Sequence, residues 1–313
     1  MKEKVFSKKI SIAISFLLFA IVVFELIYLA YPVQMIFKNT GLVMTELLLV
    51  VTAVGGCIIL RQPTNKVFPI KVPRVGEIFG VIVLWCGVFI ATITVGMLMA
   101  SLFTQEFLKT GVGLSSVIEK MPIWTRLLVM ALIPAVCEEA VHRGLIMHFL
   151  KPVQKKWVIM FIIGIEFGIL HMDFIRFPIT SIFGFALAYV LLKTDNILLC
   201  IEMHFINNAV ACLPSAKSAS TEEALSVLLS DNASLLSIMY MFSFGAMLFL
   251  CTAVPWIIYA SSLLLSEDSE GTASKRRKII ICSIISIVCV IFGTLVLSST
   301  MPQVVGGFSK IML

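Results

Sequence analysis

The stretch IPAVCEEAVHRGLIMHFL, residues 133–150, places Glu138, Glu139 and Arg143 inside an apolar run of helical length. A charged side chain in the hydrocarbon core of a bilayer costs from about 3 to more than about 10 kcal/mol, depending on the reference state. Proteins keep such residues mainly where they serve a function. The stretch therefore indicates a membrane helix that carries chemistry.

The composition extends this interpretation to the whole chain. Hydrophobic residues make up 59% and charged residues 13%, whereas soluble domains contain about 45–50% and about 25%. A spanning helix needs roughly 20 apolar residues. The sequence predicts an all-α, polytopic transmembrane helical bundle of about nine helices, or eight because the fifth to seventh runs are short. The expected helices cover residues 10–31, 41–60, 77–103, 122–150, 157–172, 177–193, 196–213, 233–264 and 279–299.

Basic residues recur in alternate loops and at the N-terminus, and they account for the net charge of +6. By the positive-inside rule these segments face the cytoplasm. The first run lacks a small-residue cleavage site, so it is expected to remain as an anchor. The run KRRK, residues 275–278, is expected to bind anionic lipid rather than nucleic acid. The N-terminus is therefore expected in the cytoplasm, and the chain's size and lack of extra domains favour a bacterial plasma membrane.

Polar side chains on three of the central helices are expected to lie at similar depth. At 1.5 Å per residue, Glu138 lies about 20 Å, His171 about 22 Å and His204 about 16 Å from the basic end of its own helix. All three ends are predicted to lie on the same face of the membrane. One shared site is the economical interpretation.

Helical spacing predicts how this site is arranged, because residues four apart lie on one face of a helix. His204 and Asn208 then point the same way. Glu139 and Arg143 can form an ion pair on one side of their helix, which leaves Glu138, about 100° around the helix, facing the site.

Other polar residues near the site have less specific interpretations. Pro134 permits a kink that could admit water, although proline is also common in membrane helices. His142 lies four residues after Glu138 and could tune it, act as a ligand, or be a hydrogen-bonded interior group. Asn207, Glu166 and Glu202 are expected to point away from the site.

Three short patterns occur in order on successive membrane helices: EExxxR, FxxxH and HxxxN. Their residues are Glu138, Glu139, Arg143, Phe167, His171, His204 and Asn208. This arrangement resembles the CPBP family, which groups type II CAAX prenyl proteases with bacterial abortive-infection and bacteriocin-processing or immunity proteins. The resemblance covers roughly residues 120–215.

The resemblance divides the chain into three parts of one integral membrane unit. Residues 120–215 are the expected catalytic core, between N-terminal membrane helices in 1–119 and C-terminal membrane helices in 216–313. Within the last part, Ser220 and Glu223 have capping-box spacing, which predicts a short interfacial helix.

The resemblance implies an intramembrane endopeptidase that hydrolyses peptide bonds of membrane-associated peptides or proteins without a cofactor. Glu138 and His171 would activate water. His204 and Asn208 would stabilise the oxyanion of the tetrahedral intermediate, while the Glu139–Arg143 pair would hold the site together. The implied partners are the lipid bilayer and a membrane-linked substrate, of which prenylated proteins are one class.

Two alternatives stay open. Glu138, His171 and His204 form a legitimate zinc-ligand set, although HExxH and CxxC motifs are absent. A transporter or immunity protein that binds a peptide without cutting it could also use membrane Glu and His residues. Transporters usually contain internal repeats, and we find none in this sequence.

Overall fold

The computed structural model describes residues 3–118, 121–213, 233–266 and 271–311, and within these ranges it contains helices and no strand. Among the described residues, six helices are long and apolar enough to cross a membrane: residues 8–37, 40–59, 75–102, 176–194, 234–251 and 272–306. Residues 197–212 and 254–264 form shorter apolar helices. The prediction of an all-α polytopic bundle is confirmed, and the chain is an integral membrane protein.

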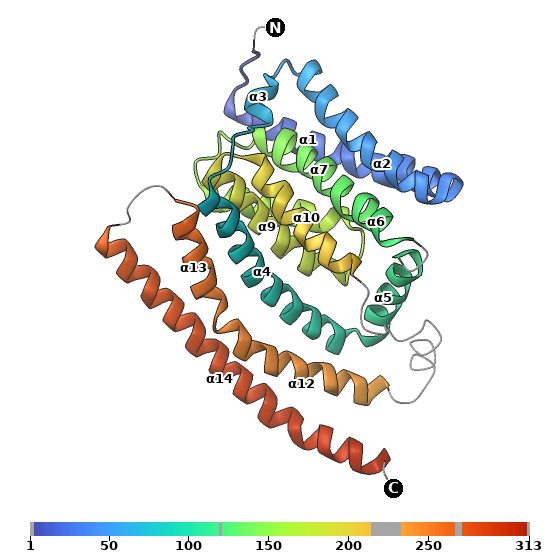
Figure 1. Cartoon of the computed structure of the whole chain (residues 1–313), viewed down its shortest axis with the longest axis vertical. Helices are drawn as coiled ribbons and strands as arrows, with labels where there is room; N and C mark the ends of the chain where they lie inside the picture. Colours follow the sequence, from blue (N-terminus) through green and yellow to red (C-terminus); the bar gives the residue numbers. More distant parts are fainter. Residues whose placement is uncertain (1–2, 119–120, 214–232, 267–270, 312–313) are drawn as a thin grey trace. The chain divides into compact units, whose positions relative to one another are not determined.

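The helices follow one another along the chain without long irregular connections in the described ranges (Figure 1). They are α1 (Lys8–Glu25), the π-helix η1 (Leu26–Ala30), α2 (Tyr31–Ile59), α3 (Thr64–Val67), α4 (Val75–Leu102), α5 (Thr104–Ile118), α6 (Ile123–Arg126), the π-helix η2 (Leu127–Leu132), α7 (Ile133–Glu139), the π-helix η3 (Ala140–Ile146), α8 (Lys156–Leu170), α9 (Arg176–Thr194), α10 (Ile197–Cys212), α12 (Ala233–Cys251), α13 (Val254–Leu264) and α14 (Thr272–Ile311).

One expected helix was wrong, and one helix was not expected. The run 233–264 forms two helices, because Pro255 lies in the first turn of α13, where its missing N–H removes no helical hydrogen bond. The polar stretch after residue 103 is helical as α5. The predicted interfacial helix at Ser220 lies outside the described residues.

The helix that carries EExxxR is irregular over a longer stretch than the kink that Pro134 was expected to permit. It alternates between α-helical and π-helical turns from Ile123 to Ile146. Pro134 lies in the first turn of α7, directly after the π-helical segment η2. A proline has no N–H to complete the preceding turn, which accounts for the irregularity at this point. π-helical turns are frequent at functional sites.

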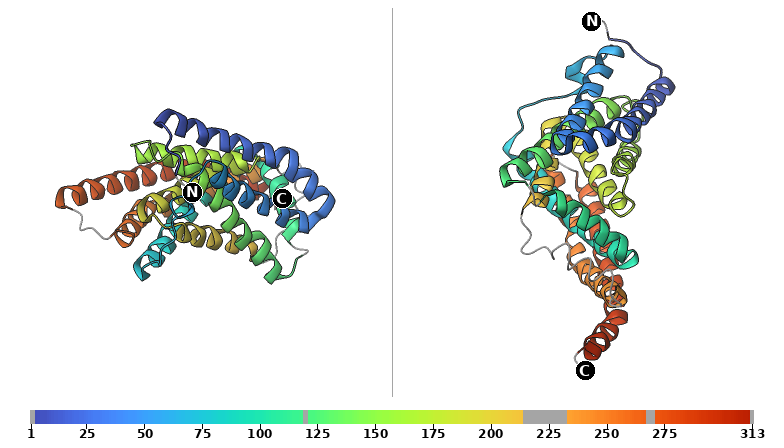
Figure 2. Two further views of the ribbon diagram at one scale, coloured as in Figure 1. Left: turned by 90° about the horizontal axis from the view of Figure 1, so that it is seen from above. Right: turned by 90° about the vertical axis from the view of Figure 1, so that its right-hand side faces the viewer.

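The chain folds into two compact units. The first comprises residues 1–81, 122–172 and 180–213, and the second comprises 82–121, 173–179 and 214–313. In the second unit, α12 and α14 pack side by side (Figures 1 and 2). A Cβ on Gly293 would lie 3.1 Å from the carbonyl oxygen of Gly245, so two glycines allow this close approach.

Within the first unit, the chain turns back on itself inside α2. A Cβ on Gly41 would lie 2.7 Å from the Cα atom of Gln34, and Gln34 Nε2 donates a hydrogen bond to Thr45 Oγ1 at 3.1 Å. The arm after this turn, residues 40–59, runs beside α7 and η3 in Figure 1 and contacts both. Gly56 packs so closely on Leu145 that a Cβ there would lie 2.5 Å from Leu145 Cδ2. α2 is therefore held in register against the helix with the EExxxR pattern.

The beginning of α10 is fixed by backbone and side-chain hydrogen bonds to the segment before α4. Asn196 caps α10 by accepting from the N–H of Leu198, and it also binds Lys71 twice: its Oδ1 accepts from Lys71 N and its Nδ2 donates to Lys71 O. Ile197 N donates to the carbonyl oxygen of Pro69 at 2.8 Å. We call these contacts the Asn196 clamp.

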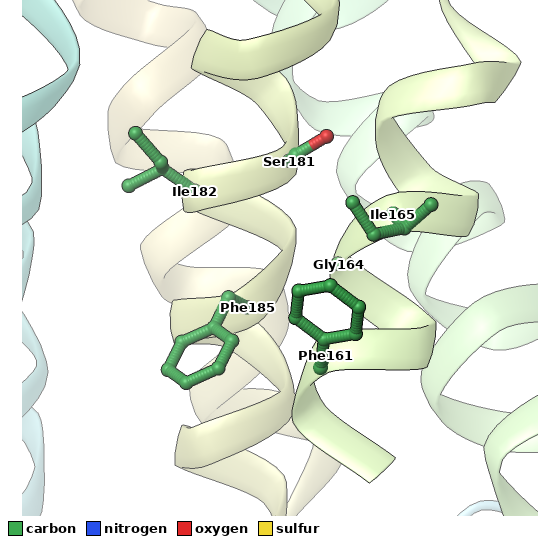
Figure 3. A pocket seen from close by; sticks show the side chains of 6 residues that line it. All are labelled: Phe161, Gly164, Ile165, Ser181, Ile182 and Phe185. Atoms are coloured by element: carbon green, nitrogen blue, oxygen red, sulfur yellow. The ribbon is translucent and has the colours of Figure 1, made fainter. Parts of the chain in front are cut away.

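Glycines allow α8 and α9 to pack closely in the first unit. A Cβ on Gly184 would lie 2.7 Å from Phe167 Cβ, and one on Gly164 would lie 2.9 Å from the carbonyl oxygen of Ser181. Next to these contacts lies a groove of ≈ 290 Å³ between the two helices, and Figure 3 shows the side chains that line it. The groove is lined by Phe161, Gly164, Ile165, Ser181, Ile182 and Phe185. It is almost wholly apolar.

Candidate active site

The predicted ion pair is present and completely buried. Arg143 Nη1 donates to Glu139 Oε1 at 3.0 Å, and both side chains have 0% exposure. Arg143 Nη2 donates to the carbonyl oxygen of Gly184 at 3.1 Å, and the guanidinium lies 4.5 Å from the centre of the Phe167 ring. One arginine thus joins η3 to α8 and α9.

His204 lies between the two adjacent glutamates. Its Nδ1 is 2.8 Å from Glu139 Oε1, the same oxygen that binds Arg143, and its Nε2 is 3.9 Å from Glu138 Oε2. A carboxylate paired with arginine can only accept, so Nδ1 of His204 is the donor. Glu139 therefore fixes the orientation of the imidazole and directs Nε2 towards Glu138.

The glutamates also differ in exposure. The side chain of Glu138 is 21% exposed, whereas that of Glu139 is fully buried. A general base must reach a water molecule or substrate. Only Glu138 of the two is open to them, in agreement with the arrangement predicted from the helical spacing.

The Phe167 ring is the centre of a cluster of three imidazoles. Ring centroids lie 5.1 Å away for His171, 5.5 Å for His142 and 5.7 Å for His204, each close to edge-on. Residues from α8 and α10 are thus brought together with η3, as the similar depths predicted. The shared site thus contains His171 and His204, both next to one aromatic ring.

His171 is the C-terminal cap of α8. Its Nδ1 is 2.9 Å from the carbonyl oxygen of Phe167, four residues earlier. Because a carbonyl oxygen can only accept, Nδ1 carries the proton. In the neutral ring the lone pair is then on Nε2, which can accept a proton.

His142 is buried with 1% exposure and its Nδ1 has no hydrogen-bond partner among the described residues. The expectation of a hydrogen-bonded interior group is thus wrong at this nitrogen. His142 interacts electrostatically with His171 and His204.

Asn208 follows His204 by one turn of α10, as predicted. The expectation that Asn207 points elsewhere is wrong, because its Nδ2 donates to Asn208 Oδ1 at 3.3 Å. Neighbouring side chains on a helix diverge by about 100°, but two short carboxamides still reach one another across that angle.

Glu46 is a residue near the site that the sequence analysis missed. It lies on α2, which packs on α7, and it interacts electrostatically with Cys137 and Glu138. Its Oε2 is buried without a hydrogen-bond partner among the described residues. A carboxyl group in the middle of an apolar run is itself a functional signal, and that signal was available in the sequence.

Glu166 is buried in α8, and neither of its carboxyl oxygens has a hydrogen-bond partner in the described part of the chain.

The structure also bears on the predicted zinc ligands. Over the described residues, no three His, Cys, Asp or Glu side chains are grouped closely enough to hold a metal ion. Glu138, His171 and His204 are accordingly not gathered into a group of this kind in the described part of the chain.

One comparison with known proteins bears on this cluster. Residues 120–210 match the family model described as type II CAAX prenyl endopeptidase Rce1-like. The match covers all three patterns and confirms the resemblance predicted for this part of the chain. No curated protein and no solved structure matches.

Proposed function

We propose that this protein is an intramembrane endopeptidase that hydrolyses peptide bonds of membrane-associated peptides or proteins. The observation that carries the proposal is the linked set Glu138, His204, Glu139 and Arg143, in which a buried pair orients an imidazole towards a partly exposed carboxylate. This set lies within the segment that matches a protease family.

In the first step, Glu138 accepts one proton of a water molecule while Nε2 of His171 accepts a hydrogen bond from the other, and the water oxygen attacks the scissile carbonyl carbon. Nε2 of His171 suits this role because its Nδ1 proton is held by the Phe167 carbonyl oxygen. The proton then passes to the amide nitrogen as the C–N bond breaks, which releases an amine and a carboxylic acid.

His204 and Asn208 stabilise the oxyanion between these two steps. Since Nδ1 of His204 donates to Glu139, Nε2 is the nitrogen left for the substrate, and it donates an N–H to the oxyanion when the ring carries a second proton. The carboxamide of Asn208 supplies the other donor. Removing one such donor typically lowers turnover by about 10²–10³.

The proposal includes no metal ion, because these side chains supply a base, a proton acceptor and two oxyanion donors by themselves. We further propose a bacterial plasma membrane location with the N-terminus in the cytoplasm. Substrates would be membrane-linked peptides, of which a prenylated C-terminal peptide is the form suited to a first test.

The test is cleavage of a farnesylated, internally quenched peptide by the full chain purified in detergent, with the products identified by mass spectrometry. Glu138→Gln keeps the shape of the side chain but removes the base, and it should lower turnover by at least about 10²-fold. Glu166→Gln is the matched control, being a buried membrane glutamate outside the cluster, and should retain turnover. Equal activity of Glu138→Gln and wild type would overturn the proposal.

A further inference from the structure

The third pattern, HxxxN, contains a second asparagine that no part of the proposed mechanism uses. Asn207 and Asn208 follow His204 by three and four residues on α10, so both carboxamides lie one helical turn beyond the imidazole. Both side chains are partly exposed rather than buried in the helix packing. They are therefore placed where a substrate carbonyl next to His204 could meet them.

The hydrogen bond between these carboxamides has a direction. Asn207 Nδ2 donates and Asn208 Oδ1 accepts, at 3.3 Å. A carboxamide has its acceptor oxygen and its donor nitrogen on opposite edges of one plane. Because Oδ1 of Asn208 binds Asn207, Nδ2 of Asn208 points away from Asn207. An oxyanion can be stabilised only from that donor edge.

We infer that Asn207 is a positioning residue that holds the Asn208 carboxamide with its N–H groups directed at the oxyanion. This inference rests on the proposed function, and it deepens it by giving a role to a variable position of the HxxxN pattern. Asn207 acts through Asn208 and does not itself contact the reacting atoms. Without Asn207, the Asn208 amide can rotate by half a turn and present its oxygen, which repels an oxyanion.

The inference makes different demands on four variants. Asn207→Ala removes the donor and should lower kcat roughly five- to tenfold with little change in KM, the size expected for one side-chain hydrogen bond. Asn207→Asp replaces the donor by an acceptor, which draws the Asn208 N–H groups towards itself, and should lower kcat at least as much. Asn207→Gln keeps a donor and should recover part of the loss. Asn65→Ala, the same change at an exposed position of α3, should leave turnover as in wild type.

A double-mutant cycle separates positioning from a general structural effect. If Asn207 acts only through Asn208, the double variant Asn207→Ala/Asn208→Ala should be no slower than Asn208→Ala alone. A double variant whose loss equals the product of the two single losses would overturn the inference, because the residues would then act independently.

A second measurement is independent of activity. The chain has six asparagines in all, at positions 39, 65, 196, 207, 208 and 232, so selective ¹⁵N labelling gives few carboxamide signals and each can be assigned by substitution. Asn207→Ala should shift the Nδ2 signals of Asn208 and speed their hydrogen exchange, whereas Asn65→Ala should not. Unchanged Asn208 signals in Asn207→Ala would overturn the inference. Absence of peptide cleavage by the wild type would instead contradict the proposed function, and the labelling result would still decide whether Asn207 orients Asn208.

Discussion

At the residue scale, the neighbouring glutamates of the EExxxR pattern show how one position along a helix changes a side chain's task. Glu139 is fully buried, and its two partners, Arg143 and His204, bind the same carboxylate oxygen. Glu138 lies at the edge of the cluster and keeps 21% of its side chain exposed. The first can only hold groups in place, whereas the second can meet a water molecule.

Arg143 should therefore matter for folding as well as for turnover. Arg143→Ala leaves the Glu139 charge buried without its cation, which costs about 3–5 kcal/mol. The unfolding temperature in detergent should fall clearly, measured by the fluorescence of a dye that reacts with newly exposed cysteines. Arg276→Ala, an exposed arginine on α14, is the control and should leave this temperature unchanged. Wild-type stability of Arg143→Ala would show that the buried pair contributes nothing.

Glu46 should have the opposite effect on stability. Its buried Oε2 lacks a hydrogen-bond partner among the described residues, and an unsatisfied group of this kind costs about 1–3 kcal/mol. Glu46→Leu should thus raise the unfolding temperature and lower turnover, since stability is often given up at functional sites. Glu77→Leu is the control, because both carboxyl oxygens of Glu77 accept hydrogen bonds from Arg74 and its loss brings no such gain. A less stable Glu46→Leu protein would contradict this expectation.

At the scale of the elements, the site depends on how closely α8 and α9 approach one another. Gly184 contacts Phe167, whose ring is surrounded by three histidines, and its carbonyl oxygen accepts from Arg143. The approach of two helix backbones thus fixes the aromatic ring and the guanidinium together. Motif spacing alone does not reveal this, because Gly184 lies outside all three patterns.

Adding one methyl group should disturb this arrangement. Gly184→Ala places a Cβ 2.7 Å from Phe167 Cβ, so α8 and α9 must separate or Phe167 must move, at about 1–3 kcal/mol. Stability and turnover should both fall. Gly55→Ala is a matched control on α2, where a Cβ has no heavy atom within 4 Å, and it should be neutral or slightly stabilising. Equal behaviour of the two variants would argue against a role for close packing.

At the scale of the whole molecule, hydrophobic run length predicted most helices, because the bilayer thickness fixes the length of a span. The spacing of Glu139 and Arg143 likewise predicted their ion pair. The sequence did not reveal the π-helical turns, the break before Pro255, or the position of Glu46 near Glu138. Lipid is as apolar as the protein interior, so apolar periodicity does not indicate which faces of membrane helices meet.

The metal content of the purified protein distinguishes the two mechanisms that the patterns allow. We expect well under one zinc per chain by elemental analysis, and turnover of the farnesylated peptide that survives dialysis against a chelator. His204→Ala should then lower turnover without changing metal content. About one zinc per chain, lost together with activity on chelation and restored with it, would replace the proposed mechanism by a zinc-dependent one.

The Asn196 clamp gives α10 a fixed starting point on the chain segment before α4. His204 comes eight residues after Asn196, which is a little more than two helical turns. The number of residues between the Asn196 clamp and His204 therefore sets both the position of the imidazole along the α10 axis and the direction in which it points. One residue more or fewer would turn His204 by about 100° and shift it by about 1.5 Å. Insertions and deletions between Asn196 and His204 should consequently not be tolerated, even where each single side chain in this interval can be substituted.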